Sequence, residues 1–303
     1  MCKFKSMIVL RTGEILSLEK SDSHNEIIKH FRLKEGISEN RNFVAVEIVP
    51  KNGLLFSCVK KEWMLTVDEE SSIPAWFSED RANYEDKCYQ HLFEFIRKVE
   101  KTGHFPGNLD VYDSDTLPAL TSVNGNLNVS GLVTLPALTS VNGNLNVSGL
   151  VTLPALTSVE GNLYVSDSAT LTALTSVGGR LDVSGSAKLN APKLTSVNGN
   201  FYVSGSVTLP ALTSVGGTFY VSDLAKLSAP ALTSVGGNLY VFGSVTLPVL
   251  TSVNGNLNVS GLVTLPALTS VEGNLYVSDS AKLTAPKLTS VNGKRYSPQE
   301  AVK

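Results

Sequence analysis

The residues best suited to chemistry lie in the first third of the chain. His24, His30, Glu47, Lys60 and Asp68 offer imidazoles, carboxylates and an amine, which are the groups that general acid–base catalysis uses. An enzyme built on them would need a concave pocket in which these side chains converge. The sequence leaves such a small enzymatic activity open as an alternative. Our main expectation is a non-enzymatic protein with no catalytic residues and no cofactor.

Two other patterns in the same region could also suggest chemistry. Asp22, Ser23 and His24 supply the residue types of a hydrolase triad, but neighbours in sequence cannot adopt that geometry. Ser23 is better explained as the first residue of a capping box that ends at Glu26 and opens a helix. We therefore expect Ser23 to have a structural role.

The cysteines and histidines do not have the spacing of a metal site. Cys2, Cys58, Cys88 and His91 could in principle meet around zinc, but the chain has no C-x-x-C or H-x-x-H motif. Three cysteines cannot all be paired within one chain, which favours free thiols in a reducing compartment. The sequence predicts no metal and a cytoplasmic location, the host cytoplasm if the chain is phage encoded.

The elements that would position these side chains form a small α+β domain over residues 1–106. The pattern predicts a hairpin, a helix, a second pair of strands and a long helix, at residues 6–10 and 14–18, 26–33, 43–49 and 54–59, and 82–101. In the long helix an apolar stripe faces the sheet, formed by Tyr84, Cys88, Leu92, Phe95 and Val99. This helix should lead into the rest of the chain.

The remainder of the chain is a repeat. The consensus G-N-L-x-V-S-G-x-x-T-L-P-A-L-T-S-V-x recurs in ten units of 18 or 20 residues, which predicts a solenoid over residues 107–292. Residues 293–303 are polar and predict a C-terminal cap. The units begin at Gly107, Gly125, Gly143, Gly161, Gly179, Gly199, Gly217, Gly237, Gly255 and Gly273.

Each unit contains one clear strand signal. Leu127 and Val129 alternate with Asn126 and Asn128, as expected for a strand with the aliphatic side chains inward. Stacking successive units would bury these side chains in one column, with the strands in a parallel sheet. At about 4.8 Å per coil, ten coils would form a rod of about 48 Å.

The second half of each unit must bend. Leu135, Leu138 and Val141 recur every three residues, which a continuous strand would not show, and Pro136 removes a backbone donor between them. This predicts a second, shorter extended segment around T-S-V. The glycine that opens the next unit, such as Gly143, is expected to supply a positive φ at a tight turn.

The spacing L-P-x-L-x-x-V-x-G-N-L-x-V resembles the coils of leucine-rich-repeat and receptor-L-domain-like β-solenoids over residues 107–292. That resemblance implies aliphatic rows in the core and one parallel sheet. The units lack the L-x-x-N/C-x-L core of a standard leucine-rich repeat, which favours a straighter, all-β coil.

Composition excludes several classes of partner. The chain has 303 residues, 42% hydrophobic and 17% charged, with a formal net charge of −2. The repeats contain only six basic and nine acidic residues, so a nucleic-acid partner is not expected. The N-terminal apolar run MIVL is too short for a signal peptide, and no 18-residue apolar run predicts a membrane span.

Two rows of the predicted rod could bind a partner. A threonine row would invite ice binding, while stacked β-branched residues equally suit a structural ladder: Thr121, Thr139, Thr157, Thr175, Thr195, Thr213, Thr233, Thr251, Thr269 and Thr289. The other row is aromatic and predicts a protein-binding stripe: Tyr164, Tyr202, Tyr220, Tyr240 and Tyr276. Glycan binding along either row remains a further alternative.

The first 90 residues, from MCKFKSMIVLRTGEILSLEK to PAWF, are similar to N-terminal regions of bacterial and prophage-encoded proteins with long β-repeat tails. This resemblance implies a cytoplasmic or phage setting. We therefore expect a scaffold whose rigid repeat surface binds a protein, such as a host protein or a virion component. Near-identity of the units also allows homo-oligomers through the solenoid face or ends.

Overall fold

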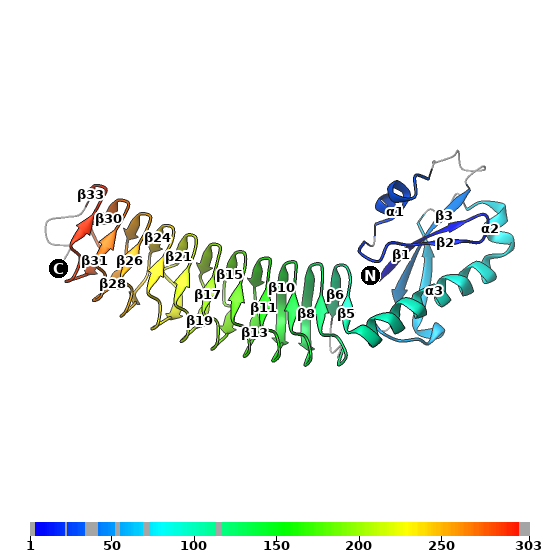
Figure 1. Cartoon of the computed structure of the whole chain (residues 1–303), viewed down its shortest axis with the longest axis horizontal. Coiled ribbons are helices and arrows are strands. Elements are labelled where there is room, and N and C mark those ends of the chain that lie inside the picture. Colours follow the sequence, from blue (N-terminus) through cyan, green and yellow to red (C-terminus); the bar gives the residue numbers. More distant parts are fainter. Residues whose placement is uncertain are drawn as a thin grey trace.

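The computed structural model describes residues 4–21, 23–33, 42–51, 55–68, 73–112 and 117–296. The chain forms an N-terminal head followed by a long, gently curved rod (Figure 1). The head contains an antiparallel sheet with helices, and the rod is a parallel β-solenoid of about ten turns. The predicted fold class is confirmed.

The head sheet has four strands in the order β2-β1-β3-β4. Strands β1 and β2 form the predicted hairpin, and β3 lies between β1 and β4 with antiparallel pairing on both sides. The bounds are β1 Lys5–Leu10, β2 Ile15–Leu16, β3 Phe43–Pro50, β4 Trp63–Val67, α1 His24–His30, α2 Ala75–Glu79, α3 Arg81–Thr102 and the 3-10 turn η2 Lys60–Glu62.

Helices α3 and α1 pack on the two faces of this sheet. The five residues of the predicted apolar stripe of α3 are all buried in the main core, where Val44 and Val46 of β3 also lie. Phe43 of β3 belongs instead to a small core with Ile27 of α1. Because neighbouring strand residues point to opposite faces, Glu47 lies on the α1 side.

Two details of the head differ from the sequence-based expectation. Residues 55–59 form a turn and irregular chain where the sequence predicted a strand. Val59 is exposed there, and the Trp63 indole donates a hydrogen bond to the Ser57 carbonyl. The strand next to β3 is β4. Ser23 does precede α1, but its side chain makes no capping hydrogen bond.

Each coil of the rod contributes up to three short strands, one more than predicted. The L-x-V strands line up along one sheet: β6 Leu109–Tyr112, β8 Leu127–Thr134, β10 Leu145–Thr152, β12 Leu163–Val165, β15 Leu181–Val183, β18 Phe201–Val203, β21 Phe219–Val221, β24 Leu239–Val241, β27 Leu257–Val259, β30 Leu275–Val277 and β33 Arg295–Tyr296.

The additional strand follows the first after a short interruption and is already part of β8 and β10. Its copies pair in register in two groups, with no pairing between β22 and β25. The first group continues from β10 through β13 Ser168–Thr170, β16 Lys188–Asn190, β19 Ser206–Thr208 and β22 Lys226–Ser228. The second is a separate three-stranded sheet of β25 Val245–Thr246, β28 Leu262–Thr264 and β31 Lys282–Thr284.

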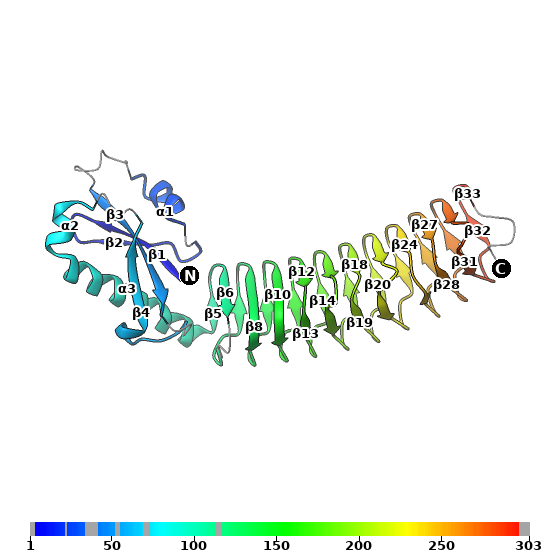
Figure 2. The same cartoon turned by 180° about the vertical axis from the view of Figure 1, so that it is seen from behind.

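The ten T-S-V segments and β5, which precedes the first repeat unit, form a separate 11-stranded parallel sheet. Its strands are β5 His104–Phe105, β7 Ser122–Val123, β9 Ser140–Val141, β11 Ser158–Val159, β14 Ser176–Val177, β17 Ser196–Val197, β20 Ser214–Val215, β23 Ser234–Val235, β26 Ser252–Val253, β29 Ser270–Val271 and β32 Ser290–Val291. Figure 2 shows these strands from behind. The bend at the L-P-A-L segment separates this sheet from the first, as predicted.

Equivalent residues of successive units stack on one another, which builds the predicted apolar column. Leu127, Leu145 and Leu163 pair in register and are fully buried. Phe201 and Phe219 replace leucine in this row, and their rings stack with centroids 4.8 Å apart. Burial of each such side chain stabilises the fold by about 1.5–3 kcal/mol relative to exposure.

The opening glycines are required for a different reason from the one predicted. Gly143 is absent from the positive-φ residues among the described part of the chain. A Cβ on Gly143 would instead lie 2.6 Å from the Asn126 Oδ1 and from the Gly125 backbone. Close approach of the preceding coil therefore excludes a side chain there.

Asparagine side chains connect one coil to the next beside these glycines. The Asn144 Oδ1 accepts a hydrogen bond of 2.8 Å from the backbone N–H of Asn162, and the Asn126 Oδ1 does the same for Asn144. This interaction satisfies a backbone donor at a turn, where no strand partner is available.

The head covers the first coil through an aromatic cluster. Helix α3 ends at Thr102, and Gly103 caps it with φ 71° and turns the chain into β5. Phe105 of β5 packs against Phe95 of α3 and Phe4, with ring centroids 5.6 and 6.3 Å away. The core of the head thus continues into the apolar column of the rod. Of the predicted polar cap, residues 297–303 lie outside the described residues, and β33 still pairs with β30.

Candidate functional site

The five tyrosines predicted to bind a partner all occupy the same position of the L-x-V strand. Strand pairing places them in one row on the outer face of the long sheet, and each ring is half-buried. We call this set the tyrosine row: Tyr164, Tyr202, Tyr220, Tyr240 and Tyr276.

The tyrosine row is continuous only in its centre. Tyr202, Tyr220 and Tyr240 lie on consecutive coils, with ring centroids 6.1 and 6.3 Å apart. Asp182 interrupts the row on one side and Asn258 on the other. The structure therefore presents a central patch of three adjacent rings. Tyr164 lies beyond Asp182, and Tyr276 lies beyond Asn258, where its ring stacks on that of Tyr296 with centroids 4.8 Å apart.

Two further side chains extend this central patch, and the sequence-based reasoning missed both. The Arg180 guanidinium lies 4.1 Å from the Tyr202 ring centroid and 5.9 Å from that of Tyr164, and it forms an ion pair with Asp182. Phe242 is 40% exposed, and its ring centroid lies 5.0 Å from that of Tyr220. Both could have been found as departures from the repeat. In the other units the position of Arg180 holds Asn or Thr, and the position of Phe242 holds mostly Ser.

The threonine row forms a hydrogen-bonded ladder. The Thr157 hydroxyl donates to the Thr139 carbonyl at 2.9 Å, and the same bond recurs along the row, for example from Thr139 to Thr121. Each hydroxyl hydrogen is therefore directed into the protein backbone. This geometry matches the structural interpretation of the row.

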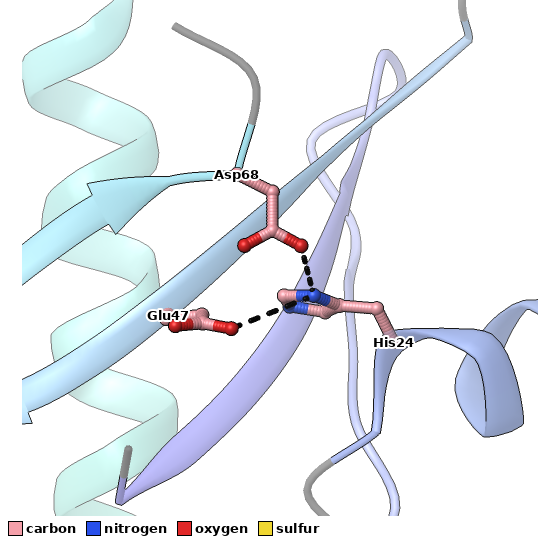
Figure 3. Close-up of side chains that lie close together, drawn as sticks. All are labelled: His24, Glu47 and Asp68. Carbon is pink, nitrogen blue, oxygen red and sulfur yellow. Dashed lines mark ion pairs between the residues drawn. The ribbon is translucent and has the colours of Figure 1, made fainter. Parts of the chain in front are cut away.

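Three of the five polar groups named from the head sequence do come together (Figure 3). The His24 Nδ1 lies 2.5 Å from the Asp68 Oδ2 and 3.9 Å from the Glu47 Oε1, while the His24 Nε2 lies 2.9 Å from the Val46 carbonyl oxygen. We call His24, Glu47 and Asp68 the head triad. Its histidine and glutamate side chains are only 10% and 11% exposed, and Asp68 is 40% exposed.

The other two groups lie elsewhere. His30 is exposed at the end of α1 and its ring contacts Phe31. Lys60 forms an exposed ion pair with Asp86 of α3. Neither residue belongs to the head triad.

The cysteines do not form a metal-binding group with His91 among the described residues, and Cys2 lies outside them. Burial, reinforced by the Glu85 charge, raises the pKa of the Cys88 thiol to about 12. The His91 Nε2 lies 2.8 Å from the Ser17 hydroxyl oxygen, and burial lowers the pKa of His91. The packing around the Cys88 thiol and the His91 imidazole indicates a structural role for both residues. Asp22 of the triad-like sequence also lies outside the described residues.

A cleft of about 470 Å³ lies where the head meets the rod, lined by Phe4, Ser21, Glu26, Asn108 and Asp110 among others. Asp110 occupies the position in the first coil that the tyrosines hold in later coils.

Comparisons of the chain with protein-family models, curated proteins and solved structures return no match. The fold and its sites must therefore be interpreted from their own geometry. Among the described residues, no helix combines the length and apolar character needed to cross a membrane.

Proposed function

We propose that this chain is a non-enzymatic interaction protein whose rigid rod binds a protein partner through the tyrosine row. The observation that carries the proposal is the central patch of Tyr202, Tyr220 and Tyr240 on consecutive coils. Tyrosine combines a large apolar ring with a polar tip and is enriched at protein interfaces.

The rod holds these rings in place before any partner binds. Parallel pairing on both sides fixes the backbone of β21, and Tyr220 also packs against the neighbouring rings. Little conformational entropy is then lost on association, which favours affinity. Arg180 and Phe242 enlarge the patch with the other residue types common at interface centres.

The proposed setting is bacterial or phage, in the cytoplasm of the cell that makes or hosts the protein. It rests on the resemblance of residues 1–90 to the N-terminal regions of prophage and bacterial β-repeat proteins. A host protein or a virion component is the proposed partner, and a second copy of the chain is the alternative.

The test removes the central rings without disturbing the fold. Asparagine stands in the same row at positions 128, 146 and 258, so the triple variant Tyr202→Asn, Tyr220→Asn and Tyr240→Asn uses a residue that this sheet already accommodates. A partner would be captured with the full chain, identified, and its dissociation constant measured with both proteins. We expect the triple variant to bind about 30-fold more weakly or worse.

A matched control changes the neighbouring row, in the coil that precedes Tyr202 and in the coil of Tyr220. Lys188 and Lys226 are exposed and pair with Ser206 between them, so Lys188→Ser with Lys226→Ser introduces a residue native to that row. This control should bind normally. Equal affinity of the triple variant and the native chain would overturn the proposal. Sedimentation of the native chain alone tests the second-copy alternative.

A further inference from the structure

The head triad places one imidazole between hydrogen-bond acceptors on both sides. The His24 Nε2 faces the carbonyl oxygen of Val46, which can only accept, so this nitrogen carries the hydrogen. In a neutral ring the His24 Nδ1 then has a bare lone pair. It is directed at the carboxylates of Asp68 and Glu47, which also offer lone pairs.

A cation at the point where these three side chains meet would interact with the lone pairs of all three. One such cation is a proton on Nδ1, because the Asp68 Oδ2 is close enough to accept a charge-assisted hydrogen bond from it. A proton bridges only two of the three lone-pair atoms, whereas a metal ion can bind all three. We propose that the head triad is a binding site for a divalent transition-metal ion of the Zn²⁺ class, a property separate from the interaction function of the rod.

The backbone fixes the three ligands from three different elements. His24 begins α1, Glu47 lies in the middle of β3, and Asp68 directly follows β4. The backbone N–H of Asp68 donates to the Ala45 carbonyl at 3.1 Å, which holds Asp68 diagonally across from Glu47. The Val46 carbonyl orients the imidazole, as backbone carbonyls that accept from the other ring nitrogen do for metal-bound histidines.

The distances suit a small ion. The three ligand atoms lie within 4.8 Å of one another. In a tetrahedral site with ligands about 2.0–2.2 Å from the ion, the ligand atoms lie about 3.4 Å apart. The 3.9 Å between the His24 Nδ1 and the Glu47 Oε1 is about 0.5 Å longer than this, a difference that side-chain rotation can close. The Asp68 Oδ2 must move away from the His24 Nδ1 by less than about 1 Å for both atoms to bind the same ion. Asp68 is the most exposed member, at 40%, and can do so by side-chain rotation.

The donor types determine the class of ion. An imidazole nitrogen favours Zn²⁺ and its neighbours in the first transition series over Mg²⁺ and Ca²⁺, which prefer all-oxygen sites. Three protein ligands leave a fourth position on the exposed side of Asp68, where water can complete a tetrahedral site.

The experiment measures Zn²⁺ binding by isothermal titration calorimetry on the full chain, with Co²⁺ absorption as a spectroscopic readout. We expect one Zn²⁺ per chain and a Co²⁺ spectrum without a thiolate charge-transfer band. Asp68→Asn and Glu47→Gln keep the shape of each side chain and should each weaken binding at least about tenfold. Circular dichroism would confirm that both variants remain folded.

Two controls exclude other ligands. His30→Asn changes an exposed histidine in the same helix, and Cys58→Ser removes an exposed thiol; both should bind Zn²⁺ as the native chain does. The inference is overturned if the native chain binds no stoichiometric Zn²⁺, or if Asp68→Asn and Glu47→Gln both retain native affinity.

Discussion

The stability of the rod should depend on single leucines of the apolar column. Leu212 is 0% exposed and lies between Leu194 and Leu232 of the adjacent coils, which are also 0% exposed. The backbone around it is held to the preceding coil by bonds such as Thr213 N–H to the Thr195 carbonyl, 2.9 Å. Because these coils cannot collapse into the space left by the truncated side chain, Leu212→Ala should cost about 3–5 kcal/mol.

A matched leucine calibrates this prediction. Leu224 is 80% exposed only twelve residues further along, so Leu224→Ala removes the same atoms with an expected change under about 0.5 kcal/mol. Native-state hydrogen exchange with mass spectrometry would measure the opening free energy of residues 205–216 in each variant. If Leu212→Ala changed that free energy by less than about 1 kcal/mol, or no more than Leu224→Ala, the continuous column would be refuted.

Two further predictions concern ionisable groups of the head. Because Cys88 has a pKa near 12 and is buried, iodoacetamide at pH 8 should modify exposed Cys58 and spare Cys88 until the protein unfolds; equal native labelling by peptide mapping would contradict this. Burial and then the charge of Lys5 lower the pKa of His91, so the unfolded chain binds the proton more tightly and the free energy of unfolding should fall as pH drops below about 6.5. His91→Gln should flatten that fall in urea titrations, and an unchanged pH slope would count against the assignment.

The architecture of the rod was predictable because the residues that specify the strand and the bend lie within each repeat unit. The alternation of Leu127 and Val129 and the three-residue spacing of Leu135 and Leu138 define strand and bend locally. The asparagine contacts were not predictable, because the partner of Asn144 lies on the next coil and becomes adjacent only after stacking. The apolar run before β4 was mistaken for a strand because its composition does not reveal that Val59 is exposed.

The candidate sites were likewise predictable only where they follow from local sequence patterns. The tyrosine row follows from the repeat phase, whereas the contact of Arg180 with Tyr202 depends on side-chain directions that a single sequence does not specify. His24, Glu47 and Asp68 could be named as candidates, but not placed together. They come together because β3 pairs with β4, and the sequence of the residues that connect these two strands does not specify that pairing.

The most direct test of the stacked-coil account is excision of whole coils. Deleting residues 125–178 removes three complete units and joins Asn124 to Gly179, which restores the repeat phase. We predict a folded protein whose maximum dimension by small-angle X-ray scattering is shorter by about 14 Å, while deletion of residues 125–169, out of phase by half a coil, disrupts the rod. An unchanged dimension, or equal disruption by both deletions, would contradict the account.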